Sequence, residues 1–490
     1  MLLNRRELLG ALGATSASTL LWALGCGGAA KPPSTPARAS GEVRTWLRDA
    51  VARLAAAFPA VHVLAVARRR TTAAVDVVGA GVARGRRDGV VLAVRDRDGR
   101  WREQVTSELT QAGIAAAVRA LAGPAGRRAS LDLGAPPPLP PEPAALDDLA
   151  LRDRVDKITR LDGKLNSRII YAAALVDIDD AHVWSISPAH DREQRLVRVR
   201  KQALRAAWNG THPVVAEAAR GWIGGVDDQD LDPAAVEQAT EDALLLMTPG
   251  AFEDKERVVV LDPTVAASLV DAGVRALCTS AAARRPEVRR RRSPDAGALP
   301  AILTIADDPA APRAYGGFRF DDEGVPAAPI VLLDGGRFAG VLADRAGAGA
   351  DAGGTGGGGR GRRPGHVGPV EPAPSHLRLA PGDVAHEALR DEGLILEGAI
   401  GATVDPSTDR VVIAAARARE LKGGEPTGRV YADVELGGEL GALLGNVSGV
   451  AKDAIALPYR DEVDGEPRWR SVEAPHLRTR GFVRARRRRA

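Results

Sequence analysis

Residues 258–278 read VVVLDPTVAASLVDAGVRALC, and this stretch decides how the second half of the chain folds. The first four residues are apolar and predict a short buried strand. Asp262 followed by Pro263 is typical of a helix N-cap with proline at the first helical position. The residues that follow are apolar at helical spacing as far as Cys278, which predicts a helix with a strongly buried face. The stretch therefore indicates a domain built from both strands and helices.

The rest of the chain after this helix is predicted to be mainly β. Short apolar runs are separated there by Gly, Pro and Asp turns, which is typical of consecutive strands. The predicted strands are residues 301–305, 330–333, 394–400, 410–415 and 429–436. Residues 346–365 are rich in Gly, Ala and Arg without an apolar period, which predicts a mobile loop.

Upstream of residue 250 the sequence predicts smaller units that mix helices and strands. Apolar residues at helical spacing predict a helix over residues 47–58 and another over 109–121. Between them a strand is expected at 61–67, and the Asp98-Gly99 pair between two apolar runs predicts a β-hairpin. These elements together predict a small α+β module.

A proline-rich segment is expected to end this first module. Six of the eight residues from 136 to 143 are proline, which predicts an extended spacer. Strands are predicted beyond it at 168–176 and 183–187, and residues 196–199 alternate with Arg as in a half-buried strand. Asp232 and Pro233 then predict the start of another capped helix.

The expected fold class is α+β, with N-terminal α+β modules followed by a mainly β C-terminal domain. The predicted divisions are a signal at 1–25, a flexible tether at 26–42, an N-terminal domain at 43–133, a middle domain at 146–250, a C-terminal domain at 251–483 and a basic tail at 484–490.

Composition excludes several classes of protein. The 490 residues carry 67 Lys and Arg against 63 Asp and Glu, a net charge of +4 that is too small to indicate a nucleic-acid partner. Two cysteines exclude a cysteine-rich zinc site and a disulfide framework. The eight histidines are dispersed, so the sequence contains no local two-histidine metal motif.

The N-terminus is typical of an export signal. Arg5 and Arg6 precede a mildly apolar stretch that ends in small residues, which predicts a twin-arginine signal. Cys26 follows Leu-Gly and resembles the lipidated cysteine of a lipoprotein. The alternative is cleavage near Ala30, which would discard Cys26. The expected location is therefore periplasmic or, through a lipid on Cys26, anchored to the envelope membrane.

Several motifs in the second half resemble one known family. The longest is the segment from Tyr315 to Pro326, which reads YGGFRFDDEGVP. Shorter motifs follow the same order along the chain: residues 259–263, 306–309, 330–336, 379–383, 401–408 and 426–430. Together they resemble the C-terminal domain of the TldD/TldE (PmbA) metalloprotease family.

The resemblance implies a two-subunit assembly that cleaves unfolded peptides. In that family the TldD-type subunit holds a metal through a His-Glu-x-x-x-His motif on a helix. Here the three motif positions fall on Val270, Asp271 and Arg275. Valine has no donor atom and arginine is a permanent cation, and no cysteine follows Cys278 to supply the family's further ligand. The resemblance therefore implies that the zinc-type site is lost, with no cofactor, as in the TldE-type subunit.

The first functional hypothesis is an exported, non-catalytic subunit that binds peptides or partners an active metalloprotease homologue. Its partner would be a TldD-type homologue, or a second copy of the chain in a homodimer. A second hypothesis is an active peptidase with an unrecognised site, for which His366, His376 and His386 are candidates. A third is a stand-alone envelope binding protein.

Overall fold

The computed structural model describes residues 40–486, except for 77–78, 124–127, 132, 134–138, 140–145, 162–166, 211–212, 294–296, 352–358, 406 and 464–465. The predicted signal with Arg5 and Arg6, Cys26, most of the tether, nearly all of the proline spacer and the last four residues of the tail lie outside the described residues. Among those that are described, no helix is long and apolar enough to cross a membrane.

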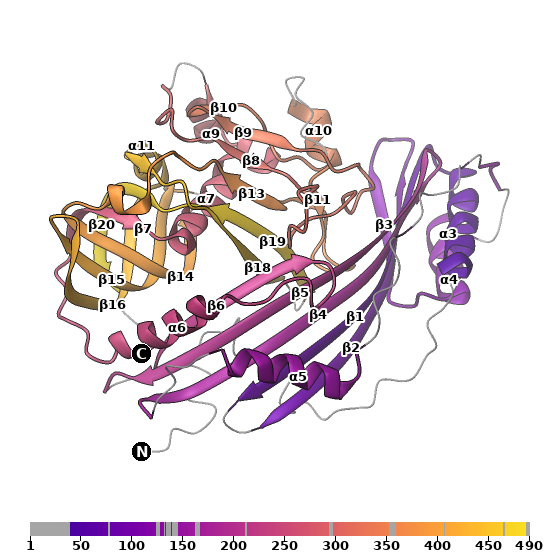
Figure 1. Cartoon of the computed structure of the whole chain (residues 1–490). Helices are drawn as coiled ribbons and strands as arrows, with labels where there is room; N and C mark the ends of the chain where they lie inside the picture. The colour runs from indigo at the N-terminus through magenta and orange to yellow at the C-terminus, as the bar shows by residue number, and fades with distance from the viewer. Residues whose placement is uncertain are drawn as a thin grey trace.

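The N-terminal half forms one six-stranded antiparallel sheet with the order β3-β2-β1-β4-β5-β6 (Figure 1). Its strands are β1 Ala60–Asp76, β2 Ala80–Arg95, β3 Trp101–Thr106, β4 Ile169–Ser187, β5 His190–Trp208 and β6 Pro213–Ile223. The sequence predicted separate modules over 43–133 and 146–250, but each contributes three strands to this sheet. The two segments are joined because β1 pairs with β4 from Val63 opposite Ile186 to Asp76 opposite Ala173.

The strands of this sheet are longer than the sequence predicted. β4 and β5 each run for 19 residues, and β4 joins the two strands that the sequence predicted at 168–176 and 183–187. Opposite charges on neighbouring strands support the continuous ladder, because Asp177 lies opposite Arg200 and Asp179 lies opposite Arg198. Such cross-strand pairs stabilise a sheet where isolated charges would disfavour it.

One face of the sheet is covered by four helices: α3 Ser40–Ala55, α4 Gln111–Ala122, α5 Asp148–Thr159 and α6 Pro233–Leu245. The helices predicted from the sequence at α3, α4 and α6 are confirmed. The predicted cap of α6 is confirmed as well, because Asp232 accepts from the amide of Ala234. Helix α5 was not predicted. Its signals are the N-cap Asp147 and buried apolar residues at the spacing of Leu151, Val155 and Ile158.

The other face of the sheet lies against the C-terminal domain and contains buried charges. The residues 196–199 were expected to be half-buried, but Arg198 is only 2% exposed. Its Nε and Nη2 donate to the carbonyls of Tyr315 and Gly317, each at 3.0 Å, and the ring of Trp469 lies 4.8 Å from its guanidinium. Burial lowers the pKa of Arg198 to about 10. The C-terminal domain therefore covers a face of the sheet that the alternating sequence pattern predicted to be exposed to solvent.

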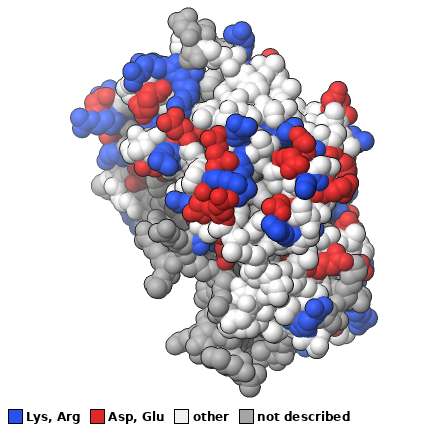
Figure 2. Space-filling view, turned by 90° about the vertical axis from the view of Figure 1, so that its left-hand side faces the viewer, with Lys and Arg blue, Asp and Glu red and all other residues white. Residues whose placement is uncertain are grey.

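The C-terminal domain contains a closed barrel, because β16 pairs with β20 at the two ends of the order β16-β15-β14-β7-β20 (Figure 1). These strands are β7 Lys255–Leu261, β14 Gly393–Asp405, β15 Arg410–Lys422, β16 Glu425–Glu439 and β20 Leu477–Ala485, with the short β17 Gly449–Val450 beside β20. Figure 2 shows this side of the molecule, where acidic and basic side chains are interspersed over most of the surface. No single charge dominates it, in agreement with the small net charge.

A second sheet of the same domain has the order β10-β9-β8-β13-β19-β18. Its strands are β8 Ile305–Asp307, β9 Ile330–Asp334, β10 Arg337–Phe338, β13 His376–Leu379, β18 Ile455–Val463 and β19 Glu466–Ala474. Helix α7 Pro263–Leu277 lies in the core shared by the barrel and this sheet. The shorter elements are α8 Ser280–Ala283, α9 Pro286–Arg292, α10 Arg345–Asp351, β11 Gly361–Arg362, β12 Glu371–Pro372, η2 His386–Leu389 and α11 Leu440–Gly445. The predicted α+β class with a mainly β C-terminal region is confirmed.

The prediction of a mobile loop over 346–365 is wrong for its described parts. They include most of α10 and all of β11. Arg360, which precedes β11, is fully buried and forms an ion pair with the equally buried Asp307. The segment lacks an apolar period because charged side chains, rather than apolar ones, fix it to the domain.

We predict that Gly316→Ala destabilises the protein by about 1–3 kcal/mol, the usual cost of overpacking. A methyl group at Gly316 would lie 2.0 Å from the carbonyl oxygen of Ser375 and 2.6 Å from the Cα of Arg470. Both are backbone atoms, so a rotamer change cannot relieve the clash. Gly445→Ala in α11 is the matched control, because its methyl group would meet nothing within 4 Å. Urea unfolding checks both variants, and equal midpoints would contradict the prediction.

Candidate functional site

Helix α7 is fixed at its first turn to the barrel. Asp262 caps the helix by accepting from the amide of Val265 at 2.8 Å, and its second oxygen accepts from the amide of Gly398 on β14 at 3.0 Å. Thr264 also accepts from a β14 amide, that of Ala399. The predicted cap is confirmed, and it sets the position of α7 relative to β14.

One stripe of α7 is polar although the helix as a whole is apolar and mostly buried. Thr264, Ser268, Asp271 and Arg275 recur at four- and three-residue spacing and therefore share one face of the helix. Ser268 donates to the carbonyl of Thr264 at 3.1 Å. This polar stripe is the sequence signal for the ion-pair cluster described below. It does not belong to the apolar period that predicted the helix.

The polar stripe ends in a cluster of ion pairs with the second sheet. Asp271 is 3% exposed and accepts from Arg470 of β19 through both oxygens, at 2.9 Å from Nε and 3.1 Å from Nη2. Arg275 adds a third contact, with its Nη2 3.0 Å from Asp271 Oδ2. Arg470 also donates from Nη1 to Asp461 of β18. Two guanidiniums and two carboxylates therefore balance one another.

The pKa shifts in this cluster follow from its ion pairs. Burial alone would lower the pKa of Arg470, but the charges of Asp271 and Asp461 outweigh burial and raise this pKa. Burial alone would raise the pKa of Asp461, yet the hydrogen bond and charge of Arg470 hold it below its usual value. Nearby on β18, burial raises the pKa of Tyr459 to about 12. Arg470 and Asp461 therefore each stabilise the charged form of the other.

The three motif positions do not fit a divalent metal. Val270 is 2% exposed within the main apolar core and has no donor atom. Arg275 is a cation, and Asp271 already accepts from two guanidiniums. Across the described residues, no group of three or more His, Cys, Asp or Glu side chains is placed to hold a metal ion.

The three candidate histidines have different neighbours. His376 on β13 is buried and its Nδ1 lies 2.8 Å from Ser471 Oγ. His386 stacks on His476, with ring centroids 4.4 Å apart. His366 packs against Gly89 of β2, where an added Cβ would lie 2.1 Å from the imidazole. The structure gives each histidine its own packing environment and does not bring the three together with an acid.

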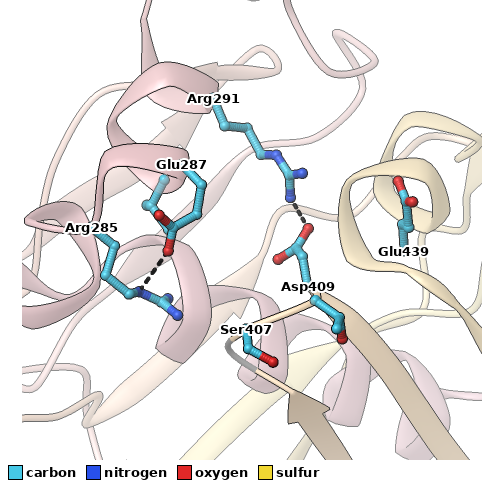
Figure 3. A pocket seen from close by; sticks show the side chains of 8 residues that line it. Arg285, Glu287, Arg291, Ser407, Asp409 and Glu439 are labelled. Carbon is cyan, nitrogen blue, oxygen red and sulfur yellow. Dashed lines mark hydrogen bonds and ion pairs between the residues drawn. The ribbon is translucent and has the colours of Figure 1, made fainter.

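Two neighbouring cavities open beside the C-terminal end of α7. The larger, of about 560 Å³, lies between α7, α8 and β14 and is lined by Arg275 and Arg285 among small residues. The smaller, of about 230 Å³, lies between α9 and the β14–β15 turn and shares Arg285 with the first. Figure 3 shows the smaller cavity, where Arg285 faces Glu287 and Arg291 forms an ion pair with Asp409. No motif in the sequence marks either cavity.

Comparisons with known proteins show what the C-terminal half of the chain is similar to. Residues 255–485 match the family described as the PmbA/TldA metallopeptidase C-terminal domain. Residues 255–485 therefore form a domain of this type, and in this half the chain is similar to the TldD/TldE (PmbA) family. It is also 34% identical over 155 residues to a metalloprotease of Methanocaldococcus jannaschii, a match that covers 31% of this chain and 33% of that protein. The match thus spans about a third of the relative's length.

Solved structures share the fold along nearly the whole chain. A protein described as a modulator of DNA gyrase from Bacteroides thetaiotaomicron superposes with a TM-score of 0.69 at 17% identity, covering 91% of this chain and 99% of its own. A Thermotoga maritima protein of the same description gives a TM-score of 0.68 at 17% identity, covering 91% and 100%. TldE from Thermococcus kodakarensis gives 0.66 at 16% identity, covering 89% and 99%. At this identity the likeness concerns the fold alone.

Proposed function

We propose that the protein is an exported, non-catalytic subunit of the TldD/TldE type. The observation that supports this most directly is the pairing of Asp271 with Arg470 and Arg275. In the family resemblance the corresponding position carries the glutamate of a metal motif. Here the positive charge beside the carboxylate belongs to guanidiniums, which can neither polarise a water molecule as a Lewis acid does nor exchange for a metal ion.

The partner that we propose is a TldD-type homologue with an intact metal motif, and a homodimer is the alternative. A subunit without metal ligands takes part in proteolysis only by supplying surface, either for the partner or for the peptide. The larger cavity beside α7 is lined by Arg275, one of the three motif positions, and a peptide is the ligand that we propose for it.

The location that we propose rests on the N-terminal sequence. Arg5 and Arg6 belong to a twin-arginine signal, and Cys26 would be the lipidated residue that anchors the protein to the envelope. Such a signal exports proteins that are already folded, so subunit and partner would be exported either together or each after folding.

The proposal predicts that the purified full chain binds no stoichiometric transition metal and hydrolyses no unfolded peptide. The reason is that the three motif positions supply one carboxylate, which is already ion-paired. Metal analysis by mass spectrometry and a peptidase assay on casein fragments check both statements, with a homologue carrying His-Glu-x-x-x-His as the positive control. Co-expression with that homologue should give a complex on size exclusion. One equivalent of metal, or peptidase activity that a chelator removes, would overturn the proposal.

A further inference from the structure

A serine hydroxyl shared by two histidines lies on the face of the N-terminal sheet that contacts the C-terminal domain. Ser185 is on β4, between His62 on the neighbouring β1 and His190 on the neighbouring β5 (Figure 1). Its Oγ is 2.8 Å from His62 Nε2 and 3.0 Å from His190 Nε2. The second ring nitrogen of His190, Nδ1, is 3.0 Å from Ser187 Oγ. His62 is 5% exposed and Ser185 0%, so this histidine cluster is shielded from solvent.

The segment 319–324 of the C-terminal domain docks directly on the histidine cluster. Gln194 of β5 exchanges two hydrogen bonds with the backbone of this segment, at 2.8 Å and 3.0 Å. Gly324 lies so close to the cluster that an added Cβ would be 2.3 Å from Ser185 Oγ and 2.5 Å from His190 Nε2. The contact between the two domains therefore includes the shared hydroxyl itself.

The histidine cluster can hold one additional proton but not two. A hydroxyl donates one hydrogen bond, a neutral imidazole has one donor and one acceptor nitrogen, and an imidazolium has two donors. With His190 protonated, its two N–H groups can donate to Ser185 and Ser187 while Ser185 donates to His62. With His62 protonated as well, both rings direct a hydrogen at Ser185, whose own hydrogen then has no acceptor in the cluster. The second proton therefore breaks a buried hydrogen bond, which is costly.

Neither imidazole has a carboxylate partner to balance a proton. Among the described residues, the side-chain hydrogen bonds of His62 and His190 go to serines. The charged side chains that act on the two rings are Arg192, Arg345, Arg363 and Asp191. Asp191 already pairs with two arginines of α3. Protonation would therefore add positive charge to a group of cations whose acid is occupied.

The pKa values of the two histidines agree with this geometry. Burial and nearby arginines lower the pKa of His190 to about 4 and hold that of His62 well below its usual value. Without the contact, both rings would return toward the ordinary value of about 6.5. The docked state therefore binds fewer protons than the released state, so release becomes more favourable as the pH falls from about 6.5 to about 4.

The docked segment also contains two buried acids, Asp321 and Glu323. They accept from backbone amides of their own domain. Burial raises the pKa of Asp321 to about 6 and that of Glu323 to about 7. As far as the sheet buries them, their protonation favours docking and delays release until the histidines take up protons. By then both acids are neutral, so the segment offers no negative charge to an imidazolium.

We propose that His62, Ser185 and His190 form an acid-sensitive contact, which holds the segment 319–324 on the N-terminal sheet at neutral pH and releases it in acid. This conformational device does not depend on metal or peptide binding and goes beyond the proposed function. It couples the relative position of the two domains to the pH around the protein.

Hydrogen exchange of the full chain, followed by mass spectrometry, measures the release. The protection of the segment 319–324 is compared at about pH 7 and about pH 4.5, with labelling times scaled to the intrinsic exchange rate at each pH. We expect this protection to fall at least about tenfold, since one unit of net pKa difference corresponds to a factor of about ten. Helix α7, which lies in the apolar core of the C-terminal domain, should keep its protection.

Glutamine variants separate protonation from hydrogen bonding. His62→Gln with His190→Gln keeps side chains that donate and accept but cannot take up a proton, so the segment should stay protected in acid. His476→Gln is the matched control, because burial lowers the pKa of His476 to about 4 as well. This histidine lies between β19 and β20 and stacks on His386, so its replacement should leave the acid-induced loss unchanged.

Each outcome decides the inference. Constant protection of the segment in the natural protein, or an equal loss in α7, would overturn it, and neither comparison needs a variant. The inference also fails if the double glutamine variant loses protection as the natural protein does, or if His476→Gln abolishes the loss. Should the double variant not fold, His190→Gln alone must reduce the loss, and an undiminished loss overturns the inference.

Discussion

Arg470→Met is expected to lower the free energy of unfolding by about 3–5 kcal/mol, the range for removing one partner of a buried ion pair. The variant leaves the buried carboxylate of Asp271 with Arg275 alone and deprives Asp461 of its ion pair. Urea unfolding followed by tryptophan fluorescence measures the change. The matched control is Arg484→Met on β20, which removes a half-exposed guanidinium paired with Glu435 and should cost at most about 1 kcal/mol.

The same variant should have an altered pH dependence. In the natural protein the folded-state pKa of Asp461 is depressed, so its stabilising contribution is present above the unfolded-state pKa and is lost as the pH falls through the folded one. Without Arg470 the largest remaining influence on this carboxyl is burial, which raises its pKa, while the charges of Arg275 and Arg468 oppose that rise less strongly. The stability deficit of Arg470→Met should therefore shrink as the pH is lowered from about 7 to about 4. A deficit that stays constant with pH would show that lost packing, not charge, causes it.

Arg360→Met is expected to lower the free energy of unfolding by a similar amount, about 3–5 kcal/mol, because it leaves the fully buried carboxylate of Asp307 without a positive partner. Arg360 and Asp307 are both 0% exposed, and the guanidinium also donates to the carbonyls of Gly359 and Asp307. Ser375 contributes two hydrogen bonds to Asp307, at 2.8 Å from its amide and 2.8 Å from its hydroxyl. These bonds hold Asp307 in place but supply no positive charge.

A double-mutant cycle separates the charge effect from the packing effect. Asp307→Asn should lower the free energy of unfolding less than Arg360→Met does. The double variant should lower it by less than the sum of the two single effects, because the two substitutions together leave no unpaired buried charge. Arg378→Met on β13 is the control, since its pair with Glu473 is partly exposed and of low expected energy. Additive costs for Asp307→Asn and Arg360→Met would contradict the assignment of a buried ion pair.

The elements that the sequence predicted well are those whose signals are local. The caps at Asp232 and Asp262 work because a carboxylate accepts from amides two or three residues later, whatever the rest of the chain does. The hairpin at Asp98-Gly99 is equally local: Gly99 adopts a φ of +88°, which a glycine tolerates without strain. Helix α5 has the same kind of local signal in its N-cap Asp147, close to the proline-rich segment.

The predictions that failed depended on partners distant in the sequence. The single N-terminal sheet follows from the pairing of β1 with β4, whose partners lie 97 to 123 residues apart, and the buried Arg198 follows from contacts with Tyr315 and Gly317 of the C-terminal domain. Buried charges in β4, β5 and the segment around Arg360 have the composition of solvent-exposed segments. Their burial depends on which opposite charge the fold brings beside them, and a single sequence does not specify that pairing.

The sequence by itself determined the resemblance of the C-terminal half to the TldD/TldE family, the capped helix α7 and the absence of histidine at positions 270 and 275, because these are properties of residue type and spacing. Only the tertiary structure decided which side chains surround Asp271 and Arg275. It brings Arg470 from β19, about two hundred residues away, onto Asp271, and it places Arg285 beside Arg275 at an open cavity. The physical reason is that an ion pair depends on distance in space, which only the packing of strands against the helix sets.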